Sequence, residues 1–358
     1  MKVLTITGTR PELIRLSIIL RKLDECCKHV HVYTNQNYDP NLSTLFIKEL
    51  GISEPDYIMD ATKDSFLGLA FIHFEAILEI EKPDKVLVLG DTNSGLLAIL
   101  AAKKGIPFYH MEAGNRCYDG AVPEETNRRV IDACSLYNLP YTENSKQNLI
   151  NEGFHKNYVF KIGNPINEVL QYYQKQINAS TVSFPSNFAL LTFHRTENVD
   201  NPARVKNVID AMQEVSKDLP VIYPLHPRSK DQFKKQGIDL KGITIIDPIG
   251  FFDFVKLEQR AKVVFTDSGT VPEETSLFHV PTIVLRNTTE RQELMENGSL
   301  ILAGTRKDDI LNAYRSIPFV SHIWKGLDDY TKLNVSDTVV RLLMGQQDFI
   351  VRKGHDEY

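Results

Sequence analysis

The stretch KVLTITGTRPE, residues 2–12, shows the pattern on which the whole chain is built. It predicts a buried strand that ends at Gly8 and turns at once into a helix, with Pro11 expected at the first helical position. Five other apolar runs end in a similar way on a histidine, a carboxylate or a glycine, at residues 86–91, 107–112, 189–194, 221–226 and 263–269. The carboxyl ends of the strands in an open parallel sheet face one crevice. We therefore expect the polar side chains at these strand ends to gather along the carboxyl edge of the sheet.

The alternation of strand-like runs with helical periodicity indicates right-handed βαβ units and parallel sheets. A chain of 358 residues exceeds the roughly 250–300 residues at which a single core stops growing. A polar stretch at 178–187 has the composition of a linker. The predicted fold class is α/β, with two Rossmann-like, doubly wound domains at residues 1–165 and 166–335. C-terminal helices at 336–358 are expected to pack back on the first domain.

Composition narrows the classes of partner. A net charge of -5 gives no support to binding of nucleic acid or an anionic membrane. None of the four cysteines is spaced as CxxC, and the adjacent pair Cys26-Cys27 disfavours bridging. No apolar run approaches the roughly 18 residues of a membrane span, and the first ten residues do not resemble a signal peptide. A reduced, cytoplasmic protein without a membrane anchor is expected.

Carboxylates follow the strands of the first half. Asp91 and Glu112 each stand where a buried strand emerges, and Glu124 lies one loop further on, in a Pro-Glu-Glu helix start. A partly desolvated carboxylate there can act as an acid or a base. Alternatively, each of them caps a helix or pairs with Arg10 or Arg116. The presence of two carboxylates on separate strand ends favours the acid/base role.

The strand ends in the second half of the chain carry hydrogen-bond donors and the N-terminus of a helix. His194 and His226 end strands, and Ser268-Gly269 precede a helix whose N-terminus suits a phosphate group. Both histidines could equally be structural, and Glu274 could simply complement the helix dipole. Phe254 fits the core, or stacks on a base. The G-x-G-x-x-G and G-x-x-x-x-G-K-[ST] fingerprints are absent.

Taken together, these motifs resemble the non-hydrolysing UDP-N-acetylglucosamine 2-epimerase family. The resemblance runs in order from residue 3 to about residue 305, and the matching segments are GTRPE at 8–12, GDT at 90–92, HMEAG at 110–114, PEETNR at 123–128, HRTE at 194–197, DSG at 267–269, EE at 273–274 and TTER at 288–291. It implies a glycosyltransferase-B arrangement of the two domains, an active site in the cleft between them, and a homodimer. It also implies C2 epimerisation of a UDP-sugar through elimination of UDP and its re-addition, without a metal or redox cofactor.

The same resemblance implies roles for residues. Asp91, Glu112 and Glu124 would serve as acids and bases at C2. The departing diphosphate would be met by Arg10, Arg15, His194 and the Ser268-Gly269 amides. Glu274 would accept the ribose hydroxyls, Phe254 would lie against the uracil, and Arg128 would bind or orient.

Three segments are similar to the branch of the family that makes UDP-N-acetyl-L-fucosamine, a precursor of surface polysaccharide: QNYD at 36–39, MEAGNRC at 111–117 and NVSD at 334–337. Arg15 stands where the main branch usually has lysine. The alternatives are a UDP-N-acetylglucosamine to UDP-N-acetylmannosamine epimerase, a hydrolysing epimerase, a glycosyltransferase-B type transferase and a UDP-sugar sensor.

Overall fold

The computed structural model describes residues 1–36, 46–59, 65–225 and 227–345, which form two compact units. Unit 1 comprises Met1–Val169 and Lys332–Tyr358, and unit 2 comprises Leu170–Thr331. The division falls within helix α7 (Ile166–Tyr172), four residues after the expected boundary. The start of α7 stays with unit 1 because Glu168 accepts hydrogen bonds from the backbone N and Oγ of Ser336.

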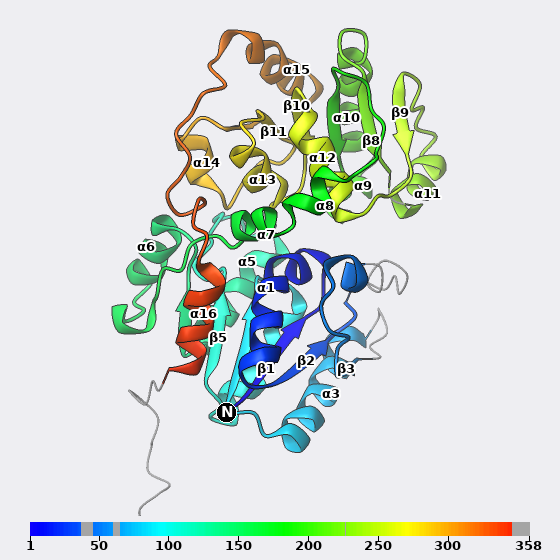
Figure 1. Ribbon diagram of the computed structural model, residues 1–358. Coiled ribbons are helices and arrows are strands. Elements are labelled where there is room, and N and C mark those ends of the chain that lie inside the picture. The colour runs from blue at the N-terminus through cyan, green and yellow to red at the C-terminus, as the bar shows by residue number, and fades with distance from the viewer. Residues whose placement is uncertain (37–45, 60–64, 226, 346–358) are drawn as a thin grey trace, which may run out of the picture. The chain divides into compact units, whose positions relative to one another are not determined.

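Unit 1 contains a six-stranded, wholly parallel sheet in the order β3-β2-β1-β4-β5-β6 (Figure 1). Its strands are β1 (Lys2–Thr7), β2 (Lys28–Tyr33), β3 (Tyr57–Ile58), β4 (Lys85–Leu89), β5 (Phe108–Met111) and β6 (Tyr137–Leu139). Its helices are α1 (Arg10–Cys26), α3 (Phe66–Glu81), α4 (Ala98–Lys103), α5 (Pro123–Cys134), α6 (Glu143–Asn151) and α16 (Val335–Met344), with short 3-10 turns at Asn93–Leu97 and Lys156–Tyr158.

Unit 2 repeats the plan with the strand order β12-β11-β10-β7-β8-β9, again wholly parallel. The strands are β7 (Ala189–Thr192), β8 (Val221–Pro224), β9 (Ile243–Ile246), β10 (Val263–Thr266), β11 (Thr282–Val284) and β12 (Leu300–Leu302). The helices are α8 (Gln174–Asn178), α9 (Thr196–Val199), α10 (Pro202–Val215), α11 (Pro227–Lys235), α12 (Phe251–Arg260), α13 (Val271–Leu277), α14 (Gln292–Glu296) and α15 (Lys307–Ser316), followed by a 3-10 turn at Ile317–Phe319.

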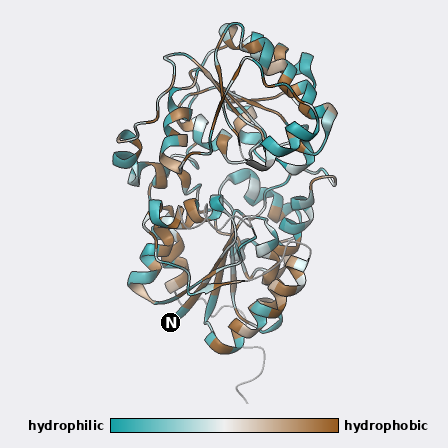
Figure 2. Ribbon diagram, turned by 90° about the vertical axis from the view of Figure 1, so that its right-hand side faces the viewer, coloured by the Kyte–Doolittle hydropathy of each residue, from teal (hydrophilic) through white to brown (hydrophobic). Residues whose placement is uncertain are grey.

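Both sheets have the Rossmann order, 3-2-1-4-5-6 when the strands of each unit are counted from its own first strand. The prediction of two doubly wound α/β domains is thereby confirmed. In each unit the central strands are apolar runs covered by helices on both faces, so side chains on both sides of these strands are buried, whereas the edge strands β3 and β9 are partly exposed (Figure 2). The order reverses between β1 and β4 in unit 1 and between β7 and β10 in unit 2. Ligand sites of this fold form at that reversal.

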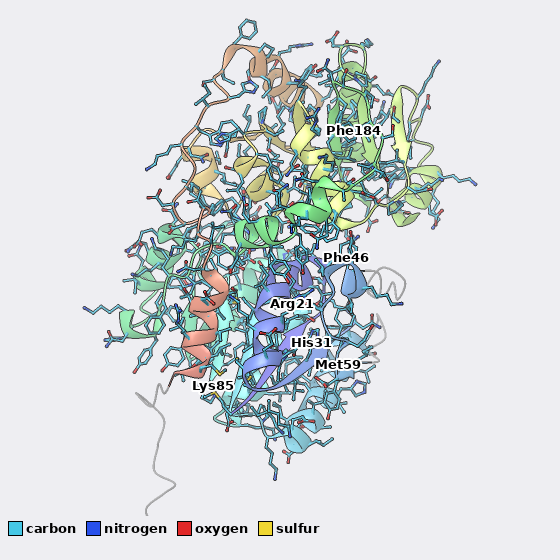
Figure 3. All side chains as sticks on the ribbon, viewed as in Figure 1. Arg21, His31, Phe46, Met59, Lys85 and Phe184 are labelled. Carbon is cyan, nitrogen blue, oxygen red and sulfur yellow. The ribbon has the colours of Figure 1, made fainter. Side chains whose placement is uncertain are left out.

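The C-terminal helix α16 packs on α1 of unit 1. Lys22 of α1 donates to Asp337 at 2.7 Å, and Lys85 at the start of β4 donates to the carbonyl oxygens of Leu343 and Gly345 at 2.6 and 2.7 Å. Figure 3 shows Lys85 below the last turn of α16, where a cation satisfies carbonyls that the helix leaves unpaired. Of the segment expected to be helical at 336–358, residues from 346 onward lie outside the described range. Within the described parts of the chain, none of the helices is long and apolar enough to cross a membrane.

Candidate active site

The turn after β1 is closed by Thr34, directly after β2, and by Ser94, in the 3-10 turn that follows β4. A Cβ built on Gly8 would stand 2.2 Å from Ser94 Oγ and 2.3 Å from Thr34 Oγ1, and those two hydroxyls hydrogen-bond at 2.6 Å. Only glycine therefore fits, because any side chain would displace the pair. Helix α1 begins at Arg10, so Pro11 occupies the second helical position and not the first as expected. Proline is tolerated there because the amide hydrogens of the first helical turn have no partner within the helix.

Glu12 holds the same turn from inside the helix. Its Oε2 accepts from the backbone N of Gly8 at 2.6 Å and of Thr9 at 3.2 Å. Burial raises the pKa of Glu12 from 4.5 to about 7, against the opposing effect of these hydrogen bonds. The sequence analysis left this carboxyl without a role, although it belongs to the GTRPE motif.

Arg10 and Arg15 both lie on α1. The guanidinium of Arg10 lies over the ring of Phe46, with Cζ 5.5 Å from the ring centroid. Arg15, one and a half turns further along the helix, is buried, with 2% of its surface exposed. The first two turns of α1, the helix that follows the carboxyl end of β1, therefore carry two cations.

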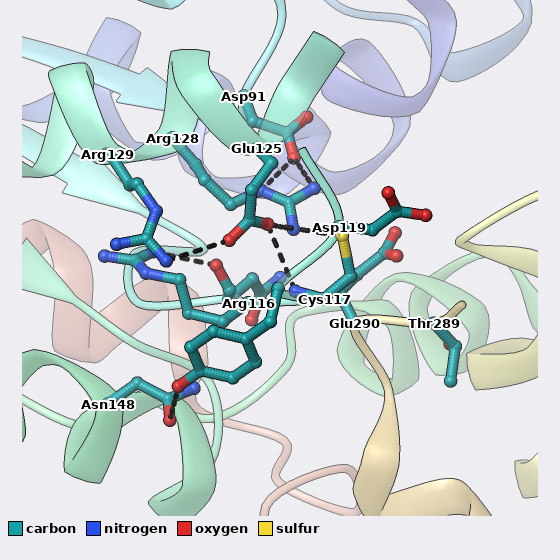
Figure 4. A network of polar contacts seen from close by, with 12 residues as sticks. Asp91, Arg116, Cys117, Asp119, Glu125, Arg128, Arg129, Asn148, Thr289 and Glu290 are labelled. Atoms are coloured by element: carbon teal, nitrogen blue, oxygen red, sulfur yellow. Dashed lines mark hydrogen bonds and ion pairs between the residues drawn. The ribbon is translucent and has the colours of Figure 1, made fainter. Parts of the chain in front are cut away.

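Asp91 lies two residues beyond the end of β4, after Gly90, and is bound by Arg128 of α5 (Figure 4). Arg128 donates to Asp91 Oδ2 from Nε at 3.1 Å and from Nη2 at 2.7 Å, and its Nη1 donates to Glu125 Oε2 at 3.0 Å. Asn127 donates to the backbone oxygen of Asp91 at 3.0 Å. The segment PEETNR thus supplies the residues that orient Asp91, which assigns Arg128 a positioning contact.

Glu125, and not its neighbour Glu124, is the buried acid of the Pro-Glu-Glu segment. Burial alone would raise the pKa of Glu125, but hydrogen bonds from Cys117 and the charge of Arg128 lower it overall. Glu124 is half-buried in the first turn of α5. Among the described residues no hydrogen bond or ion pair joins it to another side chain, so this carboxylate is not used by the fold.

Glu112 stands one residue beyond β5 in a left-handed backbone conformation, with φ of 68°. Such a conformation is unusual for a residue with a side chain and is often found at functional sites. Asn115 donates to Glu112 Oε1 at 3.1 Å, and a Cβ on Gly90 would lie 3.7 Å from Glu112 Oε2. The carboxylate therefore reaches the residue that precedes Asp91, which brings Asp91 and Glu112 to adjacent strand ends.

In unit 2, a fully buried carboxylate organises the end of β7. Asp267 accepts from the backbone N of His194 at 3.1 Å and of Arg195 at 2.9 Å, and from Asn198 Nδ2 at 3.1 Å. The imidazole of His194 is about half exposed, with Nδ1 3.6 Å from Asp267 Oδ1. This arrangement fixes the backbone at His194 while its ring remains available to a ligand.

Ser268 and Gly269 begin the turn from β10 into α13. Ser268 N donates to Thr266 Oγ1 at 2.9 Å, and Ser268 Oγ accepts from Thr270 N at 3.2 Å. A Cβ on Gly269 would lie 2.6 Å from Glu290 Oε1 and 3.8 Å from Arg286 Nη1. The glycine therefore permits close approach of the turn to a buried ion pair.

That ion pair was missed by the sequence analysis. Arg286 lies beyond the end of β11, has 6% of its surface exposed, and its Nη1 is 3.1 Å from Glu290 Oε2. Its Nη2 is buried and has no hydrogen-bond partner among the described residues. A signal for Arg286 was present, because it ends the strand-like run at 281–286 just as His194 ends its own.

Glu274 and Phe254, the residues predicted to contact the ribose and the uracil, lie on the helices α13 and α12. Glu274 is buried in α13, next to Glu273, whose carboxylate pairs with Arg291 Nε. Phe254 of α12 is partly buried and packs against a core cluster that includes Phe188 and Leu190. The packing of Phe254 against this cluster agrees with the alternative in which it belongs to the core. His226 and residues 37–39 lie outside the described range.

Among the described residues no group of three or more histidine, cysteine or acidic side chains is arranged to hold a metal ion. The site chemistry of unit 1 is carboxylate and guanidinium, and that of unit 2 is imidazole, guanidinium and backbone amide.

Comparison with known proteins shows which family the chain resembles. The family model described as UDP-N-acetylglucosamine 2-epimerase matches residues 21–344. The UDP-N-acetylglucosamine 2-epimerase of Methanocaldococcus jannaschii is 37% identical over 363 residues, which cover 96% of this chain and 99% of that protein. A UDP-2,3-diacetamido-2,3-dideoxy-D-glucuronate 2-epimerase of Pseudomonas aeruginosa is 35% identical, covering 88% and 92% respectively.

Solved structures agree with this. The Methanocaldococcus jannaschii enzyme in complex with UDP-GlcNAc and UDP superposes with a TM-score of 0.90 at 36% identity, covering 96% of this chain and 99% of that one. The Neisseria meningitidis enzyme bound to UDP-GlcNAc gives a TM-score of 0.86 at 27% identity, with coverage of 96% and 99%. The chain therefore belongs to the UDP-N-acetylglucosamine 2-epimerase family of isomerases.

Proposed function

We propose that the protein epimerises a UDP-N-acetylhexosamine at C2 by eliminating UDP and adding it back. The observation that carries the proposal is the placement of Asp91 and Glu112 at the ends of the adjacent strands β4 and β5, each oriented by a neighbouring side chain. Two related enzymes have been crystallised with UDP-GlcNAc, which supports a substrate of this class.

The reaction requires removal of the C2 proton while the bond between C1 and the UDP oxygen breaks. The products of this step are a glycal and UDP, and the reverse addition delivers a proton to the other face of C2. Asp91, Glu112 and Glu124 supply the acid and base groups. Because Arg128 holds one oxygen of Asp91, the other oxygen keeps a fixed direction for proton transfer.

Negative charge develops on the diphosphate as the C1–O bond breaks, and prearranged cations and amides lower the energy of that state. Arg10 and Arg15 provide cations in unit 1. In unit 2 we assign this role to His194, the Ser268-Gly269 amides and, in addition, Arg286, whose buried Nη2 has no acceptor among the described residues. Glu274 is proposed to accept the ribose hydroxyls and Phe254 to contact the uracil.

The test is incubation of the purified protein with a UDP-N-acetylhexosamine in heavy water, followed by NMR of the sugar nucleotide. Deuterium at C2 of an intact UDP-sugar, in both epimers, is the expected result. Release of free UDP without epimer would indicate a hydrolase, and no exchange would indicate a transferase or a sensor.

We propose further that the sugar is a 6-deoxy compound and that the product is UDP-N-acetyl-L-fucosamine. The described residues that support this proposal are Arg15, Gln36 and the segments 111–117 and 334–337. Arg15 is on α1, and Gln36 accepts from Ser94 N at 3.2 Å, beside the Gly8 turn. The segment Asn334–Asp337 instead holds α16 on α1 through Asp337 and Lys22, so it is weaker support for the sugar specificity.

We also propose a homodimer formed through α3. Ile72 and Ile80 lie two turns apart on this helix and are 64% and 68% exposed. Glu75 and Glu79, which flank them, are both paired with Lys104 of the same chain. This pairing offsets part of their negative charge and reduces the repulsion that a second copy would meet. Light scattering after gel filtration should give a dimer, and Ile72→Lys with Ile80→Lys should give a monomer; a wild-type monomer would contradict the proposal.

A further inference from the structure

His110 is a fully buried histidine in the middle of β5, and both of its ring nitrogens are engaged. Nε2 lies 2.9 Å from the backbone oxygen of Gly90, and Nδ1 lies 2.8 Å from Oδ1 of Asp132. The ring thereby joins β5 to the end of β4 on one side and to α5 on the other. The mechanism proposed above gives this ring no role.

The hydrogen-bond count fixes the protonation of the ring. A carbonyl oxygen can only accept, so Nε2 must carry a hydrogen. Asp132 already accepts from Gly114 N at 3.3 Å on each oxygen, and its Oδ2 is 2.8 Å from Arg116 Nη2. Both oxygens of Asp132 thus accept from N–H donors, as those of a carboxylate do, and a carboxylate is also only an acceptor. Nδ1 must then carry a hydrogen as well, which makes the ring an imidazolium.

Charged groups from α5, the loop after β5 and the end of α6 surround the ring. Asp132 faces it from α5, and Arg116 faces Asp132 from the loop after β5. Glu152, at the end of α6, accepts from Arg116 Nε at 2.8 Å and Nη2 at 2.6 Å. From β6, the uncharged Asn138 donates to the backbone oxygen of Asp132 at 3.2 Å. Asp132 and Arg116 are fully buried, whereas Glu152 is exposed and also pairs with Arg129 Nη1 at 3.2 Å, so the anion that directly matches the buried ring is Asp132.

Gly90 and His110 stand close in the sequence to the proposed acid and base. Gly90 immediately precedes Asp91, and His110 stands two residues before Glu112. We infer that His110 is a positioning residue, held as an imidazolium by Gly90 and Asp132, that fixes the Asp91 strand end relative to the Glu112 strand end. The effect on turnover rests on the proposed function, whereas the protonation of the ring does not.

The protonation can be measured in the wild-type protein. His110 is followed by Met111, and no other histidine of the chain precedes a methionine. Labelling histidine with carbon-13 and nitrogen-15, and methionine with nitrogen-15, therefore identifies His110 by one unique backbone correlation. Ring nitrogen shifts should show two protonated nitrogens at pH 7.5. One protonated and one unprotonated nitrogen at pH 7.5, the signature of a neutral ring facing a protonated Asp132, would overturn the inference.

Kinetics test the positioning role. His110→Gln keeps a donor for Gly90 but loses the charge and the bond to Asp132. It should lower kcat by about 10- to 100-fold, the effect expected of a misplaced catalytic group, while calorimetric UDP affinity stays unchanged. His155→Gln, at an exposed histidine, is the matched control.

If His110→Gln does not fold, Asp132→Asn serves instead, and it should convert the ring to a singly protonated form with the same loss of kcat. Unchanged kcat in a folded variant would remove the positioning role. Absence of C2 exchange in the wild type would remove the proposed function and leave the NMR result standing.

Discussion

Arg128 directs two of its donors, Nε and Nη2, to one and the same oxygen of Asp91. The second carboxylate oxygen of Asp91 is thus not engaged by Arg128. A planar guanidinium can make this double contact and at the same time reach Glu125 with its remaining arm, as Arg128 does. An ammonium group on a flexible stem cannot reproduce that geometry.

Arg128→Lys should therefore lower kcat by about 10-fold or more while leaving UDP affinity unchanged, because Asp91 keeps its charge partner but loses its orientation. Steady-state kinetics and calorimetry measure the two quantities. Arg129→Lys is the matched control, since the neighbouring arginine is exposed and touches Glu125 and Glu152 but not Asp91. Equal losses in both variants would show that charge near α5, and not the orientation of Asp91, matters.

Asp91→Asn, Glu112→Gln and Glu124→Gln should each lower turnover by roughly 100-fold or more, which is the usual contribution of an acid or base group. UDP binding and the circular dichroism spectrum should be retained. Glu296→Gln, at an exposed carboxylate of α14, should behave as wild type. Any of the three that kept near wild-type turnover would lose its catalytic assignment.

UDP binding should depend on unit 2. His194→Ala and Arg286→Ala should each weaken UDP by about 10- to 100-fold, the range for loss of a charged hydrogen bond, whereas Asp91→Asn should not. Titration calorimetry measures the affinities, with Arg306→Ala as a control at an exposed arginine of the same unit. Similar losses for Asp91→Asn and His194→Ala would contradict the division of roles between the units.

Glu12 should make stability depend on pH. The folded state binds this proton more tightly than the unfolded chain, because burial raises the pKa of Glu12 from 4.5 to about 7. Stability should therefore fall as the pH rises from about 4.5 to 7, by an amount on the order of 3 kcal/mol. Glu12→Gln keeps an acceptor for Gly8 and Thr9 but cannot ionise.

Urea unfolding at pH 5, 6, 7 and 8 checks this expectation. Relative to wild type, Glu12→Gln should gain stability between pH 5 and pH 8. Glu25→Gln, an exposed position of the same helix, should show a constant difference. A constant difference for Glu12→Gln too would mean that Glu12 is already ionised in the folded protein at pH 5.

Sugar specificity should favour a 6-deoxy UDP-N-acetylhexosamine over UDP-N-acetylglucosamine, and addition of the latter should not activate the enzyme. A buried group left without its hydroxyl partner can change discrimination by several kcal/mol, so selectivity up to roughly 10⁴-fold is physically possible. NMR of product mixtures from a panel of both substrate types measures the preference. Efficient conversion of UDP-N-acetylglucosamine to its manno epimer with sigmoidal kinetics would return the protein to the main branch.

The strand ends were predictable from sequence because a parallel sheet imposes a local pattern, an apolar run followed by a turn. Asp91, Glu112 and His194 were found in this way. The division of labour between Glu124 and Glu125 was not, since adjacent positions of a helix face different directions and the pattern does not say which is inward. Arg286 was overlooked for a related reason. Its proposed role depends on its closeness to Gly269, and the two residues follow different strands, β11 and β10.

His110 shows the same limit. A histidine inside an apolar strand is compatible with an ordinary core residue, and only the three-dimensional count of donors and acceptors reveals a charge. The acid that balances it, Asp132, lies 22 residues away in a helix. No local signal connects the two.

The seating of α16 on α1 also has a consequence for synthesis. Unit 1 is built from the beginning and the end of the chain, while unit 2 is one continuous segment between them. Domains fold as units during translation, with N-terminal segments emerging first. Unit 2 can thus finish folding while α1 still exposes the surface that Val335–Met344 later covers, and the first unit to begin emerging from the ribosome is the last to be completed.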